Sequence, residues 1–284
     1  MLTTLREVLA DAMKNGYAVP AFDCVEDVMV RAILETCELV RSPVVLMCLV
    51  GADLDGNGWA YVPGLVKAVA DFHNIPIVLH LDHATELDSI RRAVDAGFTS
   101  VMIDGSMHPF EKNVEITQAA ARIAHPKGIS VEGELGWVGG LDLQARSTGR
   151  PVLTEPKEVE KFVSMTGLDA LAVSIGTSHG VYESLPNLDI ERLKELNEIS
   201  SVPLVLHGGS GTPKDQVQQA VKNGICKMNI YADNRIAMAR GLKVSAESQT
   251  RPDPPAQELF GPLKSEIAKV VKEKIDLLLS AGRV

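Results

Sequence analysis

Residues 76–104, which read PIVLHLDHATELDSIRRAVDAGFTSVMID, decide the fold class. The segment opens with an apolar run at 76–81 and continues with residues 85–96, whose apolar members recur at three-and-four spacing. It returns to an apolar run at 100–104. Gly97 follows the helical part, where glycine commonly ends a helix. The segment therefore predicts a strand, a helix and a second strand, the repeating unit of a parallel α/β sheet.

The same alternation continues along the whole chain. The apolar runs predict eight strands, at 18–22, 43–49, 76–81, 100–104, 129–134, 170–175, 203–206 and 226–230. The stretches between them predict helices, at 28–40, 85–96, 113–125, 158–166, 190–199 and 214–223. Eight parallel strands with helical crossovers close into a (β/α)8 TIM barrel. A helix after the eighth strand and another at 259–279, joined by a Pro-rich loop, predict a C-terminal helical extension.

The competing architecture is a doubly wound sheet in two domains. We see no linker-like change of composition and no Gly-rich dinucleotide turn after an early strand, so a single barrel domain over residues 1–284 is favoured. The irregular segment 136–150 is long enough to be an active-site loop.

Composition narrows the class of protein. The 284 residues carry 28 Lys and Arg against 37 Asp and Glu, a net charge of −9, and 45% of them are hydrophobic. Without a basic stripe, we expect no nucleic-acid partner. No apolar run reaches about 18 residues and the N-terminus has no signal-like apolar region, so we expect a cytoplasmic protein without membrane contact. The four cysteines are scattered in apolar runs, which indicates reduced thiols.

Functional side chains of a TIM barrel gather at the carboxyl ends of its strands. His83 follows the third predicted strand, His179 the sixth and His207 the seventh. One histidine at such a place is more often a hydrogen-bonded core residue, but three convergent ones favour a metal site. Three imidazoles with an open fourth position are typical of catalytic zinc, so these three are the predicted zinc ligands.

Acidic residues lie beside this predicted site. Asp82 ends an apolar strand next to His83, so we expect it to act as an acid or base, or to orient a ligand. His80 points the same way as Asp82 by the alternation of a strand, which makes it a candidate to support the ligands. Asp104 and Glu134 end neighbouring strands on the same rim and are either structural acceptors or ligands of an alternative metal position.

The exits of the last two strands predict a phosphate site. The sequence GGSG (208–211) follows the seventh strand, and NIYAD (229–233) follows the eighth. In many barrels this pair of loops binds phosphate through backbone N–H groups. A tight turn that needs glycine for a positive φ is the alternative explanation of the glycine run.

Five ordered motifs together resemble the class II, zinc-dependent fructose- and tagatose-bisphosphate aldolases. They are LHLDH (79–83), MIDGS (102–106), VEGELG (131–136), AVSIGTSHG (172–180) and LVLHGGSG (204–211). The resemblance runs from about residue 5 to the C-terminus. It implies a TIM barrel with zinc on His83, His179 and His207. It also implies cleavage of a ketose 1,6-bisphosphate or 1-phosphate to dihydroxyacetone phosphate and an aldehyde.

The resemblance further implies roles residue by residue. Asp82 matches the acid or base at the C4 oxygen, and Asp104 and Glu134 match positions that can hold a second, displaced divalent ion. Asp142 stands where relatives usually have the glutamate that handles the C3 proton. The positions matching the substrate site are Gly180, Gly208, Gly209, Ser210, Asn229 and Asp233. A monovalent cation, Na⁺ or K⁺, near the phosphate and a homodimer or homotetramer are implied as well.

Some positions depart from the family pattern. Met47 and Leu49 replace a polar Gln and Ser near the aldehyde half, and Ala232 replaces a hydroxyl that often touches phosphate. Glu183 stands in a segment where many relatives place a lysine. We therefore expect a longer, less polar or unphosphorylated aldehyde to be preferred over glyceraldehyde 3-phosphate.

Two other functions remain to be weighed. A barrel metallohydrolase commonly needs a His-x-His on its first strand, and residues 18–22 offer no ligand. A catalytically weak, aldolase-like subunit that supports a partner should have lost ligands, whereas this chain keeps Asp82 and all three histidines.

Overall fold

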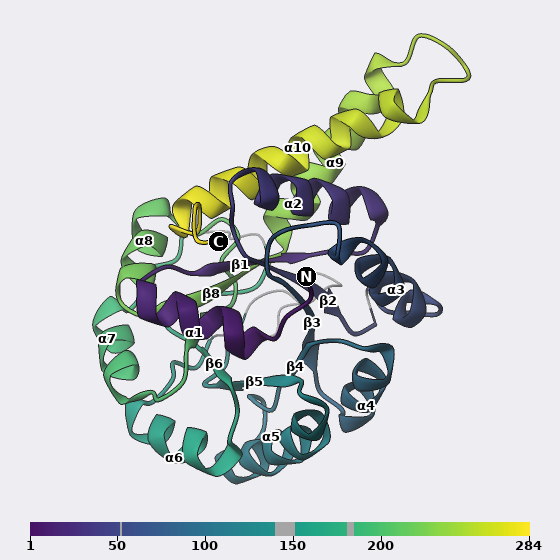
Figure 1. Cartoon of the computed structure of the whole chain (residues 1–284). Helices are drawn as coiled ribbons and strands as arrows, with labels where there is room; N and C mark the ends of the chain where they lie inside the picture. The colour runs from purple at the N-terminus through teal and green to yellow at the C-terminus, as the bar shows by residue number, and fades with distance from the viewer. Residues whose placement is uncertain (52, 140–150, 181–184) are drawn as a thin grey trace.

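The computed structural model describes residues 1–51, 53–139, 151–180 and 185–284. At its centre is a closed barrel of parallel strands in sequence order (Figure 1). The strands are β1 (Val19–Asp23), β2 (Val44–Leu49), β3 (Ile77–Ala84), β4 (Ser100–Ile103), β5 (Ser130–Leu135), β6 (Ala170–Val173), β7 (Leu204–Leu206) and β8 (Ile225–Ile230). β8 pairs with β1, with Lys227 opposite Val19, and this pairing closes the ring. The predicted (β/α)8 TIM barrel is confirmed.

Helices surround the barrel (Figure 1). They are α1 (Leu5–Asn15), α2 (Asp27–Leu39), α3 (Gly58–Ala70), α4 (Leu87–Ala96), α5 (Phe110–Ala124), the 3₁₀ helix η1 (His125–Lys127), α6 (Pro156–Thr166), α7 (Ile190–Ile199), α8 (Lys214–Lys222), α9 (Ala232–Ser248) and α10 (Ala256–Leu277). Gly97 ends α4 in the left-handed conformation, as its sequence position predicts, and Gly167 ends α6 in the same conformation.

Two α-helices of the described ranges, α1 and α3, were not among those predicted from the apolar spacing. Helix α1 begins with a capping box between Thr4 and Glu7. Helix α3 carries Pro63 inside it and starts at a glycine, and both residues weaken a helical pattern. The predicted helix at 113–125 begins earlier, at Phe110, and the predicted strand at 170–175 ends at Val173.

The inside of the barrel changes character along its axis. Leu5, Val8 and Leu9 of α1 pack with Val19 and other barrel residues in one fully or almost fully buried cluster, so α1 belongs to the apolar core at the amino end of the strands. Further along, the inward positions include buried polar side chains, namely His80, Ser100, Glu132 and Lys227. The interior of the barrel therefore changes from an apolar layer at the amino end to buried polar side chains further along the strands.

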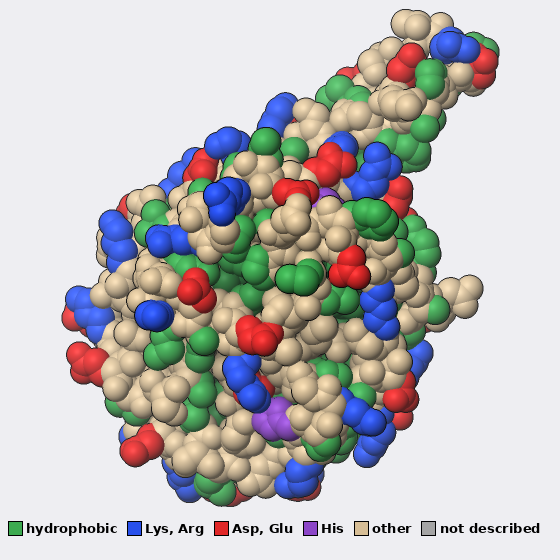
Figure 2. All heavy atoms as spheres, in the orientation of Figure 1, with side chains coloured by type: hydrophobic (Ala, Val, Ile, Leu, Met, Phe, Trp, Pro, Cys, Tyr) green, Lys and Arg blue, Asp and Glu red, His purple; other side chains and the backbone are tan. Residues whose placement is uncertain are grey.

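The predicted C-terminal extension is the hairpin of α9 and α10, which projects beyond the barrel (Figure 1). A Cβ added to Gly241 would lie 2.5 Å from the Leu263 Cα, so glycine permits the close approach of the two helices. Positive and negative side chains are interspersed on the face drawn in Figure 2, which carries no basic stripe. Among the helices of the described ranges, none combines the length and the apolar character needed to cross a membrane.

Candidate metal centre and active site

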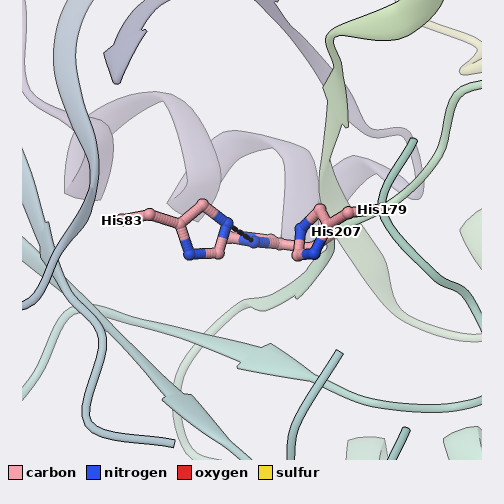
Figure 3. A group of neighbouring side chains, drawn as sticks. All are labelled: His83, His179 and His207. Atoms are coloured by element: carbon pink, nitrogen blue, oxygen red, sulfur yellow. Dashed lines mark hydrogen bonds between the residues drawn. The ribbon is translucent and has the colours of Figure 1, made fainter. Parts of the chain in front are cut away.

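Three histidines from separate strand ends come together at the carboxyl face of the barrel. His83 lies on β3, while His179 and His207 follow β6 and β7. The ring centroid of His83 lies 4.9 Å from that of His179 and 4.7 Å from that of His207 (Figure 3). His83 has a φ of 47°, and the register of β3 against β4 shifts between Leu81 and Ala84. This irregularity takes His83 out of the regular strand alternation.

Two of the rings are held by carboxylates. The Nδ1 atom of His83 lies 2.9 Å from Asp104 Oδ2, and the Nε2 atom of His207 lies 2.8 Å from Glu132 Oε1. A carboxylate accepts hydrogen bonds, so these two nitrogens carry the ring protons. The other nitrogens, His83 Nε2 and His207 Nδ1, then face each other at 2.9 Å with their lone pairs (Figure 3). Two lone pairs at this distance require a shared cation or proton.

The third ring completes the set. His179 Nδ1 lies 3.1 Å from the Val138 carbonyl oxygen, so it is the donor nitrogen. Its Nε2 is buried and lacks a hydrogen-bond partner among the described residues. One ligand atom from each of the three histidines lies within 4.8 Å of those of the other two. Three imidazoles, each fixed by an acceptor on its far side, fit a zinc ion, for which nitrogen ligands of this kind are typical.

The electrostatics without a metal ion agree with this geometry. Burial lowers the pKa of His179 to about 3, so its ring is neutral at pH 7. Burial also lowers the pKa of His83, but Asp82 and Asp104 outweigh it and raise that pKa to about 10. The carboxylates around His83 therefore favour a positive charge at the position where the three rings meet.

Asp104 and Glu134 form a second group with His83, and one ligand atom of each lies within 4.8 Å of the others. Glu134 Oε1 accepts a hydrogen bond from the Val138 N–H at 3.0 Å, while its buried Oε2 has no hydrogen-bond partner among the described residues. Burial and the neighbouring Asp104 raise the pKa of Glu134 to about 8. Burial alone would raise the pKa of Asp104, but His83 and Ser106 lower it below its usual range.

Asp82 lies next to the three histidines but is not in their group. Its side chain is almost completely buried, and both carboxylate oxygens accept from Asn229 Nδ2 at 3.1 Å. His80 Nε2 lies 3.6 Å from Asp82 Oδ1, so these two side chains share a face of β3 as the sequence predicts. Burial alone would raise the pKa of Asp82, but His83 and His80 outweigh it and hold the pKa well below its usual range. Asp82 is thus an ionised carboxylate.

The glycine run after β7 contacts the loop after β6. Gly208 has a φ of 65°, and a Cβ on it would lie 2.4 Å from the Ser178 carbonyl oxygen. A Cβ on Gly209 would lie 2.5 Å from the Met228 Cγ. Gly180 also has a positive φ, 89°. These turns and close approaches therefore explain why glycine is needed at these positions.

Ser210 and Asp233 join that loop to the start of α9. The Ser210 hydroxyl accepts from the N–H groups of Tyr231 and Asp233 at 3.2 and 3.3 Å. Asp233 in turn accepts from the Gly211 N–H at 3.2 Å and pairs with Lys274 at 2.5 Å. In this arrangement both side chains hold the loop against α9.

A cluster that the sequence did not reveal lies at the ends of β1 and β8. Arg235 pairs through Nε with Asp23 and through Nη2 with Asp53 at 2.8 Å. Asn234 Nδ2 donates to Asp23 Oδ1 at 3.0 Å. The guanidinium also lies over the Tyr231 ring, 4.9 Å from its centroid. Each residue is unremarkable in sequence, and the cluster forms only because the closed barrel brings residues about 210 positions apart together.

Two other histidines lie away from the centre. His73 pairs with Glu38 and His125 with Asp169, near the amino ends of strands. Asp142 and Glu183 lie outside the described residues.

Comparison with known proteins identifies the family. The family described as fructose-bisphosphate aldolase class-II matches residues 3–283. The chain belongs to this family. This class II aldolase is accordingly a carbon–carbon lyase, and the resemblance of the five motifs is confirmed.

Individual relatives match this class II aldolase over nearly its whole length. A fructose-bisphosphate aldolase from Giardia intestinalis is 39% identical over 308 residues, covering 99% of this chain and 94% of the relative. The crystal structure of the YdjI aldolase from Escherichia coli matches with a TM-score of 0.88 and 31% identity, covering 100% of this chain and 99% of that one. A fructose-bisphosphate aldolase from Campylobacter jejuni, at 22% identity and a TM-score of 0.83, covering 100% of this chain and 97% of that one, shares the fold.

Proposed function

We propose that this class II aldolase catalyses zinc-dependent, reversible cleavage of a ketose 1,6-bisphosphate or ketose 1-phosphate to dihydroxyacetone phosphate and an aldehyde. The observation that carries the proposal is the convergence of His83, His179 and His207, each with its far nitrogen fixed by an acceptor. Neutral nitrogen ligands favour zinc over magnesium or calcium, which prefer oxygen.

Asp82 is the group we assign to proton transfer. In the cleavage direction its carboxylate takes the proton of the C4 hydroxyl as the C3–C4 bond breaks, and in condensation it returns that proton. Asn229 Nδ2 contacts both oxygens and so fixes the carboxylate in one orientation. A zinc ion on the three histidines would supply Lewis-acid stabilisation of the negative charge that cleavage leaves on the donor half. This scheme needs no lysine Schiff base.

We assign the donor phosphate to the loops after β6, β7 and β8. The residues in this assignment are Gly180, Gly208, Gly209, Ser210, Asn229 and Asp233, with a monovalent cation nearby. The loop after β7 lies against the start of α9, because the Ser210 hydroxyl accepts from the Tyr231 and Asp233 N–H groups, and this pair of loops binds phosphate in many barrels. Asp233 serves this site by holding the Gly211 N–H and Lys274.

The side chains that we assign to the aldehyde half of the substrate favour an aldehyde that carries no phosphate. Met47 is buried on β2, and Leu49 ends that strand. The guanidinium of Arg235 is already compensated by Asp23 and Asp53, so it offers little net positive charge to a second phosphate. A phosphate that lacks a free cation would be costly to desolvate.

Five further assignments complete the proposal. Asp104 and Glu134 would hold a second, displaced divalent ion, and Asp142 would handle the C3 proton. Residues 1–284 would act as one domain, in a homodimer or homotetramer. A cytoplasmic location is consistent with four cysteines that are all free thiols.

The test is a reaction with purified protein. Zinc-loaded protein is mixed with dihydroxyacetone phosphate and a panel of aldehydes, and consumption of dihydroxyacetone phosphate is followed. We expect aldehyde-dependent consumption that a chelator abolishes and zinc restores. His179→Ala should bind zinc more weakly and lose activity, while His108→Ala, at an exposed histidine outside the cluster, should match the parent protein. Activity that survives complete metal removal would refute the proposal.

A further inference from the structure

Lys227 is a fully buried lysine in the middle of the barrel wall. It lies on β8 with Val19 of β1 and Val205 of β7 as its strand partners, and both neighbours belong to the apolar cluster of the barrel. Its side chain is 0% exposed. Burying an ammonium group is expensive unless a partner compensates the charge.

The partner is Glu132 on β5, across the barrel from β8. Lys227 Nζ donates to Glu132 Oε2 at 2.8 Å and to Oε1 at 3.1 Å, and the glutamate is also 0% exposed. Buried ion pairs can often be replaced by apolar side chains without loss of stability. Stability alone therefore does not explain why this pair stands at the centre of the barrel.

Glu132 has a second contact, which leads to the three histidines. Its Oε1 accepts both from Lys227 Nζ and, at 2.8 Å, from His207 Nε2. This bond decides that Nε2 carries the ring proton and that Nδ1 keeps its lone pair toward His83. Lys227, Glu132 and His207 thus form one chain of contacts.

A competing contact shows why Glu132 has to be held. His80 Nε2 lies 3.9 Å from Glu132 Oε2, is buried, and has no hydrogen-bond partner among the described residues. Without the ammonium group, the carboxylate could turn toward His80 and release His207. Contacts from Lys227 to both oxygens fix the plane of the carboxylate against this movement.

We propose that Lys227 is a positioning residue: it fixes Glu132, so that Glu132 holds His207 in the tautomer whose Nδ1 binds the metal ion. This inference rests on the proposed function, because it assumes a metal ion on the three histidines. In this role Lys227 contacts Glu132 and not the reacting groups. Its effect on the reaction is exerted through Glu132.

The test compares zinc affinity in Lys227→Met, Glu132→Gln and the double variant, measured by competition with a chromophoric chelator. We expect each single variant to bind zinc about 10–100-fold more weakly, the range found when the outer partner of a liganding histidine is lost. Because Lys227 acts through Glu132, the double variant should bind zinc as Glu132→Gln does. Arg6→Met, which removes a cation from Asp169 at the opposite end of the barrel, is the control and should leave the affinity unchanged.

A second readout follows the tautomer directly. In metal-free protein labelled with ¹⁵N-histidine, His207 should show the Nε2-protonated form, and Lys227→Met should show a mixture of forms. If Lys227→Met does not fold, the double variant, which leaves no unpaired buried charge, decides through its comparison with Glu132→Gln. Parental zinc affinity in folded Lys227→Met, or multiplicative losses in the double variant, would overturn the inference. Parental affinity in His179→Ala would instead refute the proposed metal site.

Discussion

Replacing Asp82 with alanine should separate proton transfer from metal binding. Asp82 is not in the group formed by the three histidines, so Asp82→Ala should keep zinc on His83, His179 and His207. The carboxylate is almost completely buried and both of its oxygens contact Asn229. Bulk water therefore cannot readily take its place as the base. We expect ketose cleavage to fall by about a hundredfold or more, which corresponds to about 2.7 kcal/mol in activation free energy.

The loss should be specific to one step of the reaction. Exchange of the donor C3 proton of dihydroxyacetone phosphate with D₂O, followed by NMR, does not need Asp82 and should persist. The variant leaves Asn229 Nδ2 without its acceptor, so stability should fall by about 1–3 kcal/mol, measured by urea unfolding. Asp95→Ala, at an exposed residue of α4, is the matched control and should retain full cleavage. Loss of zinc from Asp82→Ala, or cleavage within tenfold of the parent, would refute the assigned role.

Three further predictions follow from the same site. In metal-free protein, the free energy of unfolding should rise as pH increases from about 3 to 6.5, because burial lowers the pKa of His179 and only the unfolded chain binds a proton there. Urea unfolding across this range should show a smaller rise in His179→Ala. An identical rise in that variant would contradict a buried, neutral His179. Asp104→Asn should weaken zinc binding about 10–100-fold, because Asp104 fixes the His83 ring, and unchanged affinity in a chelator competition would show that the contact is dispensable. The specificity constant kcat/KM should be higher for a ketose 1-phosphate than for fructose or tagatose 1,6-bisphosphate, because two carboxylates already compensate the positive charge of Arg235. A value of about 10⁴–10⁸ M⁻¹s⁻¹ for either bisphosphate would disprove this.

Much of the fold could be predicted from local sequence. The barrel follows from the repeated period of apolar residues, and the three histidines follow from their position at strand ends, where a parallel barrel brings side chains together. Helix α3 was not predicted, because Pro63 and the glycines within it interrupt the spacing of apolar residues that indicates a helix. Its formation depends on packing against the barrel, which no local window of sequence contains.

The parts of the site that were missed are defined by contacts across the barrel. Lys227 reads as one polar residue in an apolar strand, and only closure of the ring brings it to Glu132, 95 positions earlier. The pairing of Arg235 with Asp23 likewise spans 212 positions. By contrast, the shared face of His80 and Asp82 is a two-residue relation, and the strand period alone predicts it correctly.

The most direct measurement is a zinc titration of metal-free protein in which bound zinc and the rate of ketose cleavage are followed together. We predict that cleavage is absent without metal, rises in proportion to the first equivalent of bound zinc and levels off at about one ion per chain on the three histidines, whether or not a second ion then binds at Asp104 and Glu134. His179→Ala should need far more zinc to reach any activity, because it removes a buried ring nitrogen aimed at the ion. Cleavage at the parental rate in metal-free protein, or a His179→Ala titration identical to that of the parent, would contradict the proposed metal site.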